Sequence, residues 1–325
     1  MKEANNVADK NLLKLKCKIC GNETGNELVI ATERMFGLGD RFDYFVCAEC
    51  KCLQIKEIPE NIEKYYPQDY YSYQEAVFPS ELNRFNFFLK KSLIKHYMGY
   101  FNLTGFLLSF VFEHPFYWIR KRELSFESKI LDIGSGAGRK LLSLQRSGFL
   151  NLTGTDPYID RDIFYENGVK ILKKEIDDIE GTYDFIMLHH SFEHMEDPKH
   201  IITQLSRLMK PDGVALIRIP VADSFAWHKY QTWWFGLDAP RHFFLHTPRS
   251  MAILLQGTDL KIDEIIYDST ALQFTGSIKY MKNLLFDSPD DMFTKKEIRA
   301  YTREAKKLNR TGQGDWACFY LKKAH

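Results

Sequence analysis

Apolar and polar residues alternate in blocks from residue 129 onward. Short apolar runs bounded by turn residues predict seven strands. They cover residues 129–133, 152–156, 169–172, 183–188, 214–219, 261–267 and 316–321. Helical periodicity predicts helices over residues 139–147 and 198–209, and residues 210–213 predict a turn. Strands that alternate with helices indicate an α/β fold with a doubly wound, mostly parallel sheet of seven strands.

The first 128 residues follow another pattern. Residues 28–31 and 42–47 are apolar or alternating and predict the strands of a small ribbon. Residues 82–124 predict helices that are interrupted at Gly99 and Gly105 and stop at His114-Pro115. We therefore expect three units: a ribbon over residues 1–60, a helical linker or cap over 61–128, and the α/β domain over 129–325.

Residues 97–112 form an apolar segment that is too short to span a membrane. Its 16 residues include Asn102 and Thr104 and fall short of the roughly 20 that a membrane-spanning helix needs. Lysines and arginines flank it, so contact with a membrane surface is the less favoured hypothesis. We expect the segment to be buried against the α/β domain or in a dimer interface.

The composition is that of a folded protein without a dominant charge. Its 325 residues are 45% hydrophobic and 14% aromatic, which is enough for a sizeable core. The formal net charge of +1 gives no global electrostatic reason to expect nucleic acid as a partner. Residues 1–16 lack the continuous apolar stretch of a signal peptide, so we expect a cytoplasmic protein.

Five of the six cysteines lie within the first 52 residues. Cys17 and Cys20 form one C-x-x-C pair, and Cys47 and Cys50 form a second. In a cytosolic protein such pairs are typical of metal ligands rather than disulfides. Four thiolates complete a closed tetrahedral zinc site with no open position, which predicts a structural zinc ribbon. Cys52 is an alternative to Cys50, but the C-x-x-C spacing favours Cys50.

A glycine-rich loop follows the first predicted strand of the α/β domain. Gly134, Gly136 and Gly138 allow sharp turns and close approach of a ligand to the backbone. The G-x-G-x-G spacing is one residue shorter than a dinucleotide fingerprint, and Asp132 before it suits a cationic amine better than a phosphate. Asp156, after the second strand, can accept hydrogen bonds from ribose hydroxyls. A plain strand-to-helix turn is the alternative interpretation of the loop.

Four segments together resemble the motifs of class I S-adenosylmethionine-dependent methyltransferases. They are residues 131–138 (LDIGSGAG), 154–157 (GTDP), 183–194 (YDFIMLHHSFEH) and 208–213 (LMKPDG). The resemblance implies a Rossmann-like methyltransferase fold and S-adenosylmethionine as cofactor. The residues it assigns to that cofactor are Asp132, Gly134, Ser135, Gly136, Gly138, Asp156, Pro157, Glu175, Ile176 and His189. Glu175 stands where many relatives carry aspartate, so Asp177 is an alternative for the adenine contact.

The N-terminal ribbon points to a narrower group among these methyltransferases. Two C-x-x-C pairs, a Tyr-Tyr-Pro segment at residues 65–67 and a methyltransferase core resemble bacterial enzymes of polysaccharide and natural-product pathways, as does the segment 236–242. Some of those enzymes methylate nucleotide-linked sugars, which implies a small, sugar-like acceptor. One alternative is methylation of RNA or protein with the ribbon as a docking module, which the mixed charges of the ribbon disfavour. Another is a non-catalytic cofactor-binding scaffold, which the intact set of acids and glycines disfavours.

Histidines concentrate where the acceptor is expected. Seven of the ten lie between residues 189 and 246, and His190, His194 and His242 are the candidate general bases. A purely structural role in closing the loop after the fourth strand is the alternative. His190, Glu193 and His194 also resemble, in their one, four, five spacing, a divalent-metal set of certain O-methyltransferases, and His242 could supply a fourth ligand.

Residues 226–236 are rich in aromatic side chains and follow the fifth strand. They could form a lid over a sugar ring or pack as part of the core, and the sequence favours neither. Arg218 or Arg241 could pair with a phosphate or carboxylate of the substrate.

Overall fold

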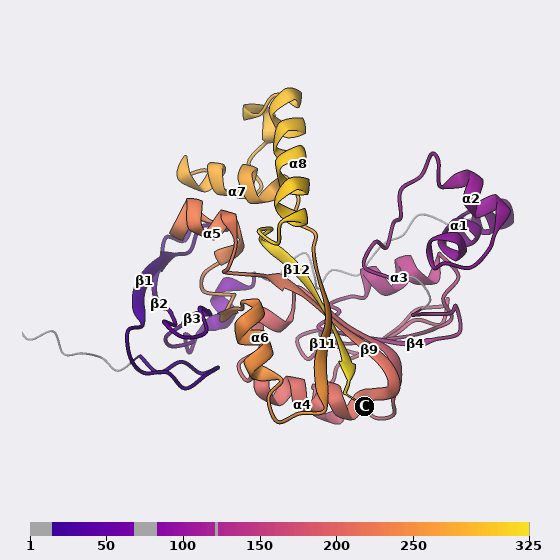
Figure 1. Cartoon of the computed structure of the whole chain (residues 1–325), viewed down its shortest axis with the longest axis horizontal. Helices are drawn as coiled ribbons and strands as arrows, with labels where there is room; N and C mark the ends of the chain where they lie inside the picture. The colour runs from indigo at the N-terminus through magenta and orange to yellow at the C-terminus, as the bar shows by residue number, and fades with distance from the viewer. Residues whose placement is uncertain (1–14, 68–82, 121–122, 325) are drawn as a thin grey trace, which may run out of the picture.

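The computed structural model describes residues 15–67, 83–120 and 123–324. The expectation that no targeting peptide begins the chain falls largely on residues 1–14, outside the described residues. Figure 1 shows a central sheet between a small ribbon at one end and the helix pair α1 and α2 at the other. The helices are α1 (Arg84–Tyr97), α2 (Leu103–Leu108), α3 (Arg139–Gln145), α4 (Pro198–Leu208), α5 (Phe225–Tyr230), α6 (Pro248–Leu254), α7 (Leu272–Met281) and α8 (Lys295–Arg310).

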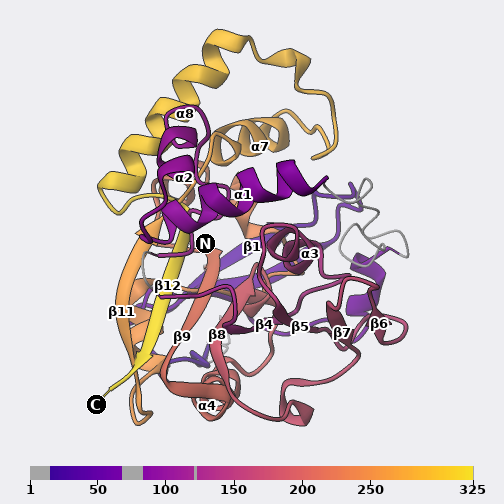
Figure 2. The ribbon, with the colours of Figure 1, turned by 90° about the vertical axis from the view of Figure 1, so that its right-hand side faces the viewer.

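The central sheet has eight strands in the described part of the chain, in the order β11-β12-β9-β8-β4-β5-β7-β6 (Figure 2). The strands are β4 (Lys129–Ile133), β5 (Asn151–Thr155), β6 (Ile163–Phe164), β7 (Lys170–Leu172), β8 (Tyr183–His189), β9 (Met209–Pro220), β11 (Leu260–Tyr267) and β12 (Trp316–Lys323). The five strands β9, β8, β4, β5 and β7 are parallel, while β6, β12 and β11 pair antiparallel. The predicted Rossmann-like sheet is confirmed, with β6 as an added edge. Residues 210–213, predicted as a turn, lie within the bounds of β9 but interrupt its pairing with β8, where the register shifts between Tyr183 and Phe185.

Alternation of side chains along buried strands places helices on both faces of the sheet. Leu131 and Ile133 of β4 pack in one apolar cluster with residues of α4 and α6. Ile130 of the same strand points to the opposite face of the sheet and packs with residues of α3 and of the segment 116–119. Because successive strand residues face opposite sides, both faces of β4 are apolar and both are covered.

The N-terminal ribbon is completed by a distant segment. Its strands β1 (Glu27–Thr32), β2 (Arg41–Val46) and β3 (Leu53–Ile55) form an antiparallel sheet, and β10 (Phe244–Leu245) pairs with β3 as the fourth strand. Tyr44 of the ribbon and Trp234 share one apolar core. The aromatic segment 226–236 therefore contributes to this core, with Trp227 and Trp234 buried and Trp233 only partly covered.

The residues that flank helix α2 leave much apolar surface exposed. Phe101 is 92% exposed, Val111 77% and Phe110 73%. The expected burial of residues 97–112 against the α/β domain is therefore wrong for these side chains, and a dimer interface stays a prediction. Among the described helices, none is both long enough and apolar enough to cross a membrane.

Candidate functional site

The glycine loop joins β4 to α3 and adopts a backbone that other residues resist. Gly134 and Gly138 have φ angles of +71° and +78°. A Cβ atom at Gly134 would lie 2.5 Å from Cβ of Ser191, and one at Gly138 would lie 2.4 Å from Cδ1 of Ile171. Both the dihedral angles and the packing therefore require glycine at these positions. The amides of Gly134 and Ser135 donate to the carbonyl of Thr155, which holds the loop against the end of β5.

Two buried carboxyl groups lie at this loop. Asp156 Oδ2 accepts a hydrogen bond from the Gly136 amide at 2.9 Å, and Oδ1 accepts one from the Tyr158 amide at 3.0 Å. Each oxygen keeps a further lone pair for a ligand. Asp132 is 3% exposed, and burial raises its pKa to about 7 despite the attraction of Lys140. Acids therefore line the loop at both places where the sequence predicts a cofactor.

The remaining predicted cofactor residues surround the ends of β7 and β8. Glu175 is exposed and precedes the short 3-10 helix Ile176–Asp178, in which Ile176 is buried. Both oxygens of Asp177 lie 2.9 Å from Nε2 of His200. Asp177 thus has a partner within the chain, and the adenine contact of Glu175 or Asp177 stays a prediction.

His189 is the last residue of β8 and is almost completely covered. It is 7% exposed, and neither ring nitrogen has a hydrogen-bond partner among the described residues. Its ring lies edge-on to Trp118 with 4.7 Å between ring centroids. Burial holds the pKa of His189 well below its usual value, so the ring is neutral. A buried imidazole without partners at the end of a strand is compatible with a ligand that covers it.

Glu193, His194 and His242 converge just beyond β8. One ligand atom from each of the three lies within 4.8 Å of the others. Nδ1 of His194 lies 2.7 Å from the Arg241 carbonyl, and Nδ1 of His242 lies 2.8 Å from the Gly236 carbonyl. A carbonyl only accepts, so both Nδ1 atoms carry the proton and both Nε2 atoms keep a lone pair.

Glu193 is the unsatisfied member of this group. Its side chain is fully buried, and neither carboxylate oxygen has a hydrogen-bond partner in the part of the chain that the structure describes. Nε2 of His242 lies 3.8 Å from Glu193 Oε1. Burial raises the pKa of Glu193 to about 8 and lowers that of His194 to about 3. At neutral pH the three groups are therefore mostly uncharged, with the proton on Glu193.

His190, the third predicted base, belongs to a different network. Its Nε2 accepts a hydrogen bond from Arg218, whose Nε donates to Asp268 at 2.6 Å. His190 Nδ1 lies 3.4 Å from Glu193 Oε1. With Nε2 occupied by a guanidinium, His190 has no lone pair for an acceptor proton or a metal. As candidate metal ligands, the structure therefore favours Glu193, His194 and His242 over the set with His190 that the sequence spacing predicts.

The two arginines predicted to bind a substrate anion face acids of the chain itself. Arg218 pairs with Asp268, and both side chains are less than a tenth exposed. Arg241 is completely buried and pairs with Asp238 and Glu33. Neither guanidinium is placed to take up a substrate phosphate, because each would first have to leave its carboxylate.

The four predicted zinc ligands come together in the ribbon. The Sγ atoms of Cys17 and Cys50 lie 3.6 Å apart, and those of Cys20 and Cys47 lie 3.5 Å apart. All four sulfurs lie within 4.8 Å of one another. Cys52 is buried outside this set, with its sulfur 3.8 Å from the Leu53 carbonyl.

Residues 107–265 match the family model of a methyltransferase domain. This match spans the glycine loop, Asp156 and the end of β8, where the predicted cofactor residues lie. The chain therefore contains a methyltransferase domain.

Known proteins match this domain rather than the whole chain. EEF1A lysine methyltransferase 2 from Danio rerio is 32% identical over 120 residues, which are 31% of this chain and 51% of that protein. A ubiquinone biosynthesis O-methyltransferase from Rickettsia bellii is 27% identical over 152 residues, 42% of this chain and 63% of that protein. The chain thus spans about half to three fifths of the length of these relatives.

Among solved structures, an O-methyltransferase from a trans-AT PKS multienzyme of Brevibacillus brevis, in complex with S-adenosyl-L-homocysteine, aligns with a TM-score of 0.37 and 18% identity. The alignment covers 61% of this chain and 67% of that one. A sarcosine dimethylglycine methyltransferase from Galdieria sulphuraria, described as putative, aligns with a TM-score of 0.40 and 16% identity over 61% and 79% of the two chains.

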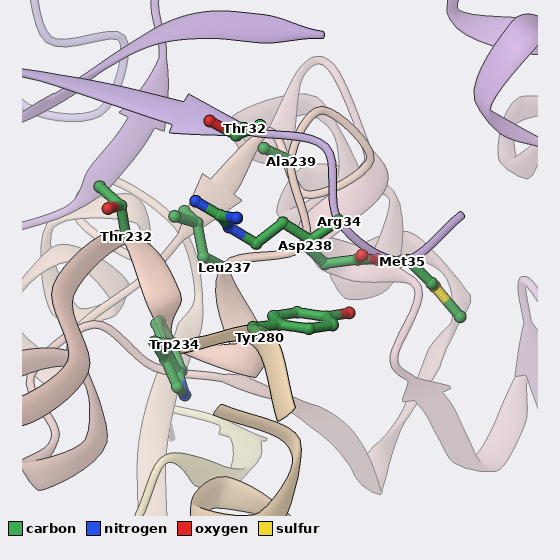
Figure 3. A pocket seen from close by; sticks show the side chains of 9 residues that line it. All are labelled: Thr32, Arg34, Met35, Thr232, Trp234, Leu237, Asp238, Ala239 and Tyr280. Carbon is green, nitrogen blue, oxygen red and sulfur yellow. The ribbon is translucent and has the colours of Figure 1, made fainter. Parts of the chain in front are cut away.

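A pocket that sequence reasoning missed lies between the methyltransferase domain and the ribbon (Figure 3). It is a small hollow of about 10 Å³, room for roughly one water molecule, and opens to solvent on one side. The residues that line it are Thr32, Arg34, Met35, Thr232, Trp234, Leu237, Asp238, Ala239 and Tyr280. Three segments far apart in the sequence meet here, so no local motif could have indicated it.

Proposed function

We propose that the chain is an S-adenosylmethionine-dependent methyltransferase that acts on a small molecule. The observation that carries this proposal is the glycine loop, whose left-handed backbone is held by Asp156 and lined by the buried carboxyl of Asp132. Two buried acids at such a loop suit a cofactor with a cationic amine and a ribose better than a diphosphate.

Each residue at the loop has a role in holding that cofactor. Asp132 would attract the amine of the methionine part, Asp156 would accept from the ribose hydroxyls, and Glu175 would face the adenine edge. The unpartnered ring of His189 fits a group that closes over the end of β8. When bound, S-adenosylmethionine supplies an electrophilic methyl group on a sulfonium.

We assign the role of general base to His242. Its Nε2 keeps a lone pair, because Nδ1 donates to the Gly236 carbonyl. Burial lowers the pKa of His242, and the neighbouring Asp238 counteracts that effect. Asp238 Oδ2 lies 3.8 Å from Nε2 and would stabilise the imidazolium formed when His242 takes a proton from the acceptor. Burial lowers the pKa of His194 to about 3 although Asp238 acts on it too, so His194 is a weak base.

The acceptor that we favour is a sugar nucleotide or a glycan precursor. The joined ribbon and methyltransferase core support this assignment through their resemblance to enzymes of polysaccharide pathways. Methylation of a protein is the second candidate, favoured by the identity with a lysine methyltransferase from Danio rerio. A turnover screen against nucleotide sugars, free glycans and protein acceptors separates the two.

We propose that the four cysteines of the ribbon hold a structural zinc ion. A tetrahedral site with Zn–S distances of about 2.3 Å has S–S edges of roughly 3.8 Å, close to the observed pairs at 3.5 and 3.6 Å. Gln54 Nε2 donates to the Cys17 sulfur at 3.1 Å, the kind of contact that supports a thiolate ligand. All four ligands are protein atoms, so this zinc would take no part in methyl transfer.

The cofactor proposal is tested by isothermal titration with S-adenosylhomocysteine. The wild type should bind it, Asp156→Ala should bind it at least tenfold more weakly, and the exposed Asp160→Ala should match the wild type. Absence of binding to the wild type would refute the proposed activity as a whole.

A further inference from the structure

Arg34 is a partly buried cation without an acid to neutralise it. Its guanidinium carbon lies 3.5 Å from the centroid of the Trp233 ring, which fixes the orientation of the group. Its Nε atom is buried and has no hydrogen-bond partner among the described residues. No ion pair involves Arg34 in that part of the chain, in contrast to the paired Arg218 and Arg241.

Glu33, the acid next to Arg34 in the sequence, has other partners. Glu33 accepts hydrogen bonds from the amides of Phe36 and Leu38 at 2.9 and 2.8 Å, and its Oε1 faces Arg241. Its carboxylate therefore holds the loop after β1 and supports Arg241, instead of pairing with its neighbour in sequence.

Tyr280 supplies a second unpaired donor to the same pocket. Its side chain is 3% exposed, and its buried hydroxyl has no hydrogen-bond partner in the described part of the chain. Figure 3 shows Arg34 and Tyr280 lining one pocket together with Asp238. Asp238 accepts from Arg241 with both oxygens, and no hydrogen bond joins it to Arg34 or Tyr280 in the described part of the chain. A buried donor left unpaired costs about 1–3 kcal/mol, so this pair of groups favours a ligand that accepts.

The chemistry of the two donors specifies the ligand. A guanidinium packed against an aromatic ring presents its N–H groups in a fork that matches a phosphate or carboxylate. The pocket also adjoins the reaction site, since Asp238 lines it and lies 3.8 Å from the proposed base His242. We propose that Arg34 and Tyr280 bind an anionic group, a phosphate or a carboxylate, of the methyl acceptor.

This inference rests on the proposed function and extends it to the class of substrate. It also gives the ribbon a role in binding the methyl acceptor. Arg34 lies just after strand β1 of the ribbon, whereas Tyr280 lies on α7. An acceptor bound in this way would therefore contact both units at once.

The test is isothermal titration with three small anions: inorganic phosphate, pyrophosphate and acetate. The wild type should bind at least one at millimolar concentrations, and the preferred anion identifies the group as phosphate or carboxylate. Arg34→Gln should weaken this binding roughly tenfold, Tyr280→Phe by less, and Arg34→Lys should restore part of it. The matched control is Arg249→Gln, an exposed arginine that pairs with Glu49 of the ribbon.

Two results would overturn the proposal: no binding of any of the three anions by the wild type, or equal affinity in Arg34→Gln. Thermal melting identifies any variant that fails to fold, and Tyr280→Phe, which keeps the ring, then decides the matter. Titration with S-adenosylhomocysteine should be the same in Arg34→Gln and the wild type. Failure of that cofactor to bind the wild type would refute the methyltransferase activity, while the anion titration tests Arg34 by itself.

Discussion

Replacing Asp132 with asparagine should stabilise the free protein and weaken its cofactor binding. Asp132 is 3% exposed, and burial raises its pKa from 3.8 to about 7. An acid whose pKa is raised on folding contributes stability below its unfolded pKa and loses it as the pH rises through its folded pKa. For these two values the loss is about 4 kcal/mol at pH 8, incurred between about pH 4 and pH 7.

The Asp132→Asn substitution removes the buried charge but keeps a polar group that still has to be accommodated. We therefore expect recovery of only part of the loss, about 1 to 2 kcal/mol at pH 8. That corresponds to a rise in melting temperature of roughly 2 to 8 °C at pH 8 and little change at pH 4. Differential scanning calorimetry of the ligand-free protein at the two pH values measures both.

Binding of S-adenosylhomocysteine should change in the opposite direction. Only about one tenth of the Asp132 carboxyl groups are ionised at pH 6, so the wild-type affinity should be roughly tenfold lower there than at pH 8. Asp132→Asn should bind weakly and nearly independently of pH. The exposed Asp160→Asn serves as the control and should leave stability and binding unchanged.

A lower melting temperature of Asp132→Asn at pH 8 would show that burial of the charge is not the dominant energy. The proposed role of Asp132 would also fail if the variant kept the pH dependence of wild-type binding. In that case another group would control the ionisation that cofactor binding requires.

Three further predictions concern the loop, the ribbon and the buried glutamate. Gly138→Ala should weaken cofactor binding and lower the melting temperature, since its Cβ would lie 2.4 Å from Cδ1 of Ile171 at a φ of +78°; unchanged titration and melting would contradict this. Cys50→Ser should lose zinc and melt earlier, whereas Cys52→Ser should retain one zinc per chain by elemental analysis; equal retention in both would disprove the ligand set. Glu193→Gln should keep most of the turnover, because an amide is a neutral group of the same shape as the protonated carboxyl, and wild-type turnover should survive chelation. Loss of turnover on chelation, reversed by Mn²⁺, would show instead that a cation occupies this position.

Much of the α/β domain could be predicted because its signals are local. Buried parallel strands need apolar residues on both faces, so β4 and β8 are visible as apolar runs without knowledge of their partners. The left-handed backbone at Gly134 and Gly138 restricts these positions to glycine for the same local reason. The C-x-x-C pairs are local as well, and the ribbon brings together the four sulfurs that this spacing predicted.

The predictions that were wrong or incomplete depend on contacts between distant segments. Residues 244 and 245 complete the ribbon sheet, which their short apolar sequence does not reveal. The exposure of Phe101 and Val111 contradicts the burial expected from their apolar character, since composition does not say which neighbour covers a side chain.

The sequence by itself determined seven strands of the α/β domain, the glycine loop and the cysteine set, because each is encoded by periodicity or spacing within a few residues. Only the tertiary structure decided which charged groups are free to act. Arg218 and Arg241 were the predicted anion ligands, yet Asp268, Asp238 and Glu33 neutralise them. Arg34 belongs to no sequence motif, yet the fold places it against Trp233 with no ion pair among the described residues. The availability of a charge depends on what lies within a few ångströms of it, and those neighbours come from segments up to about 200 residues away along the chain.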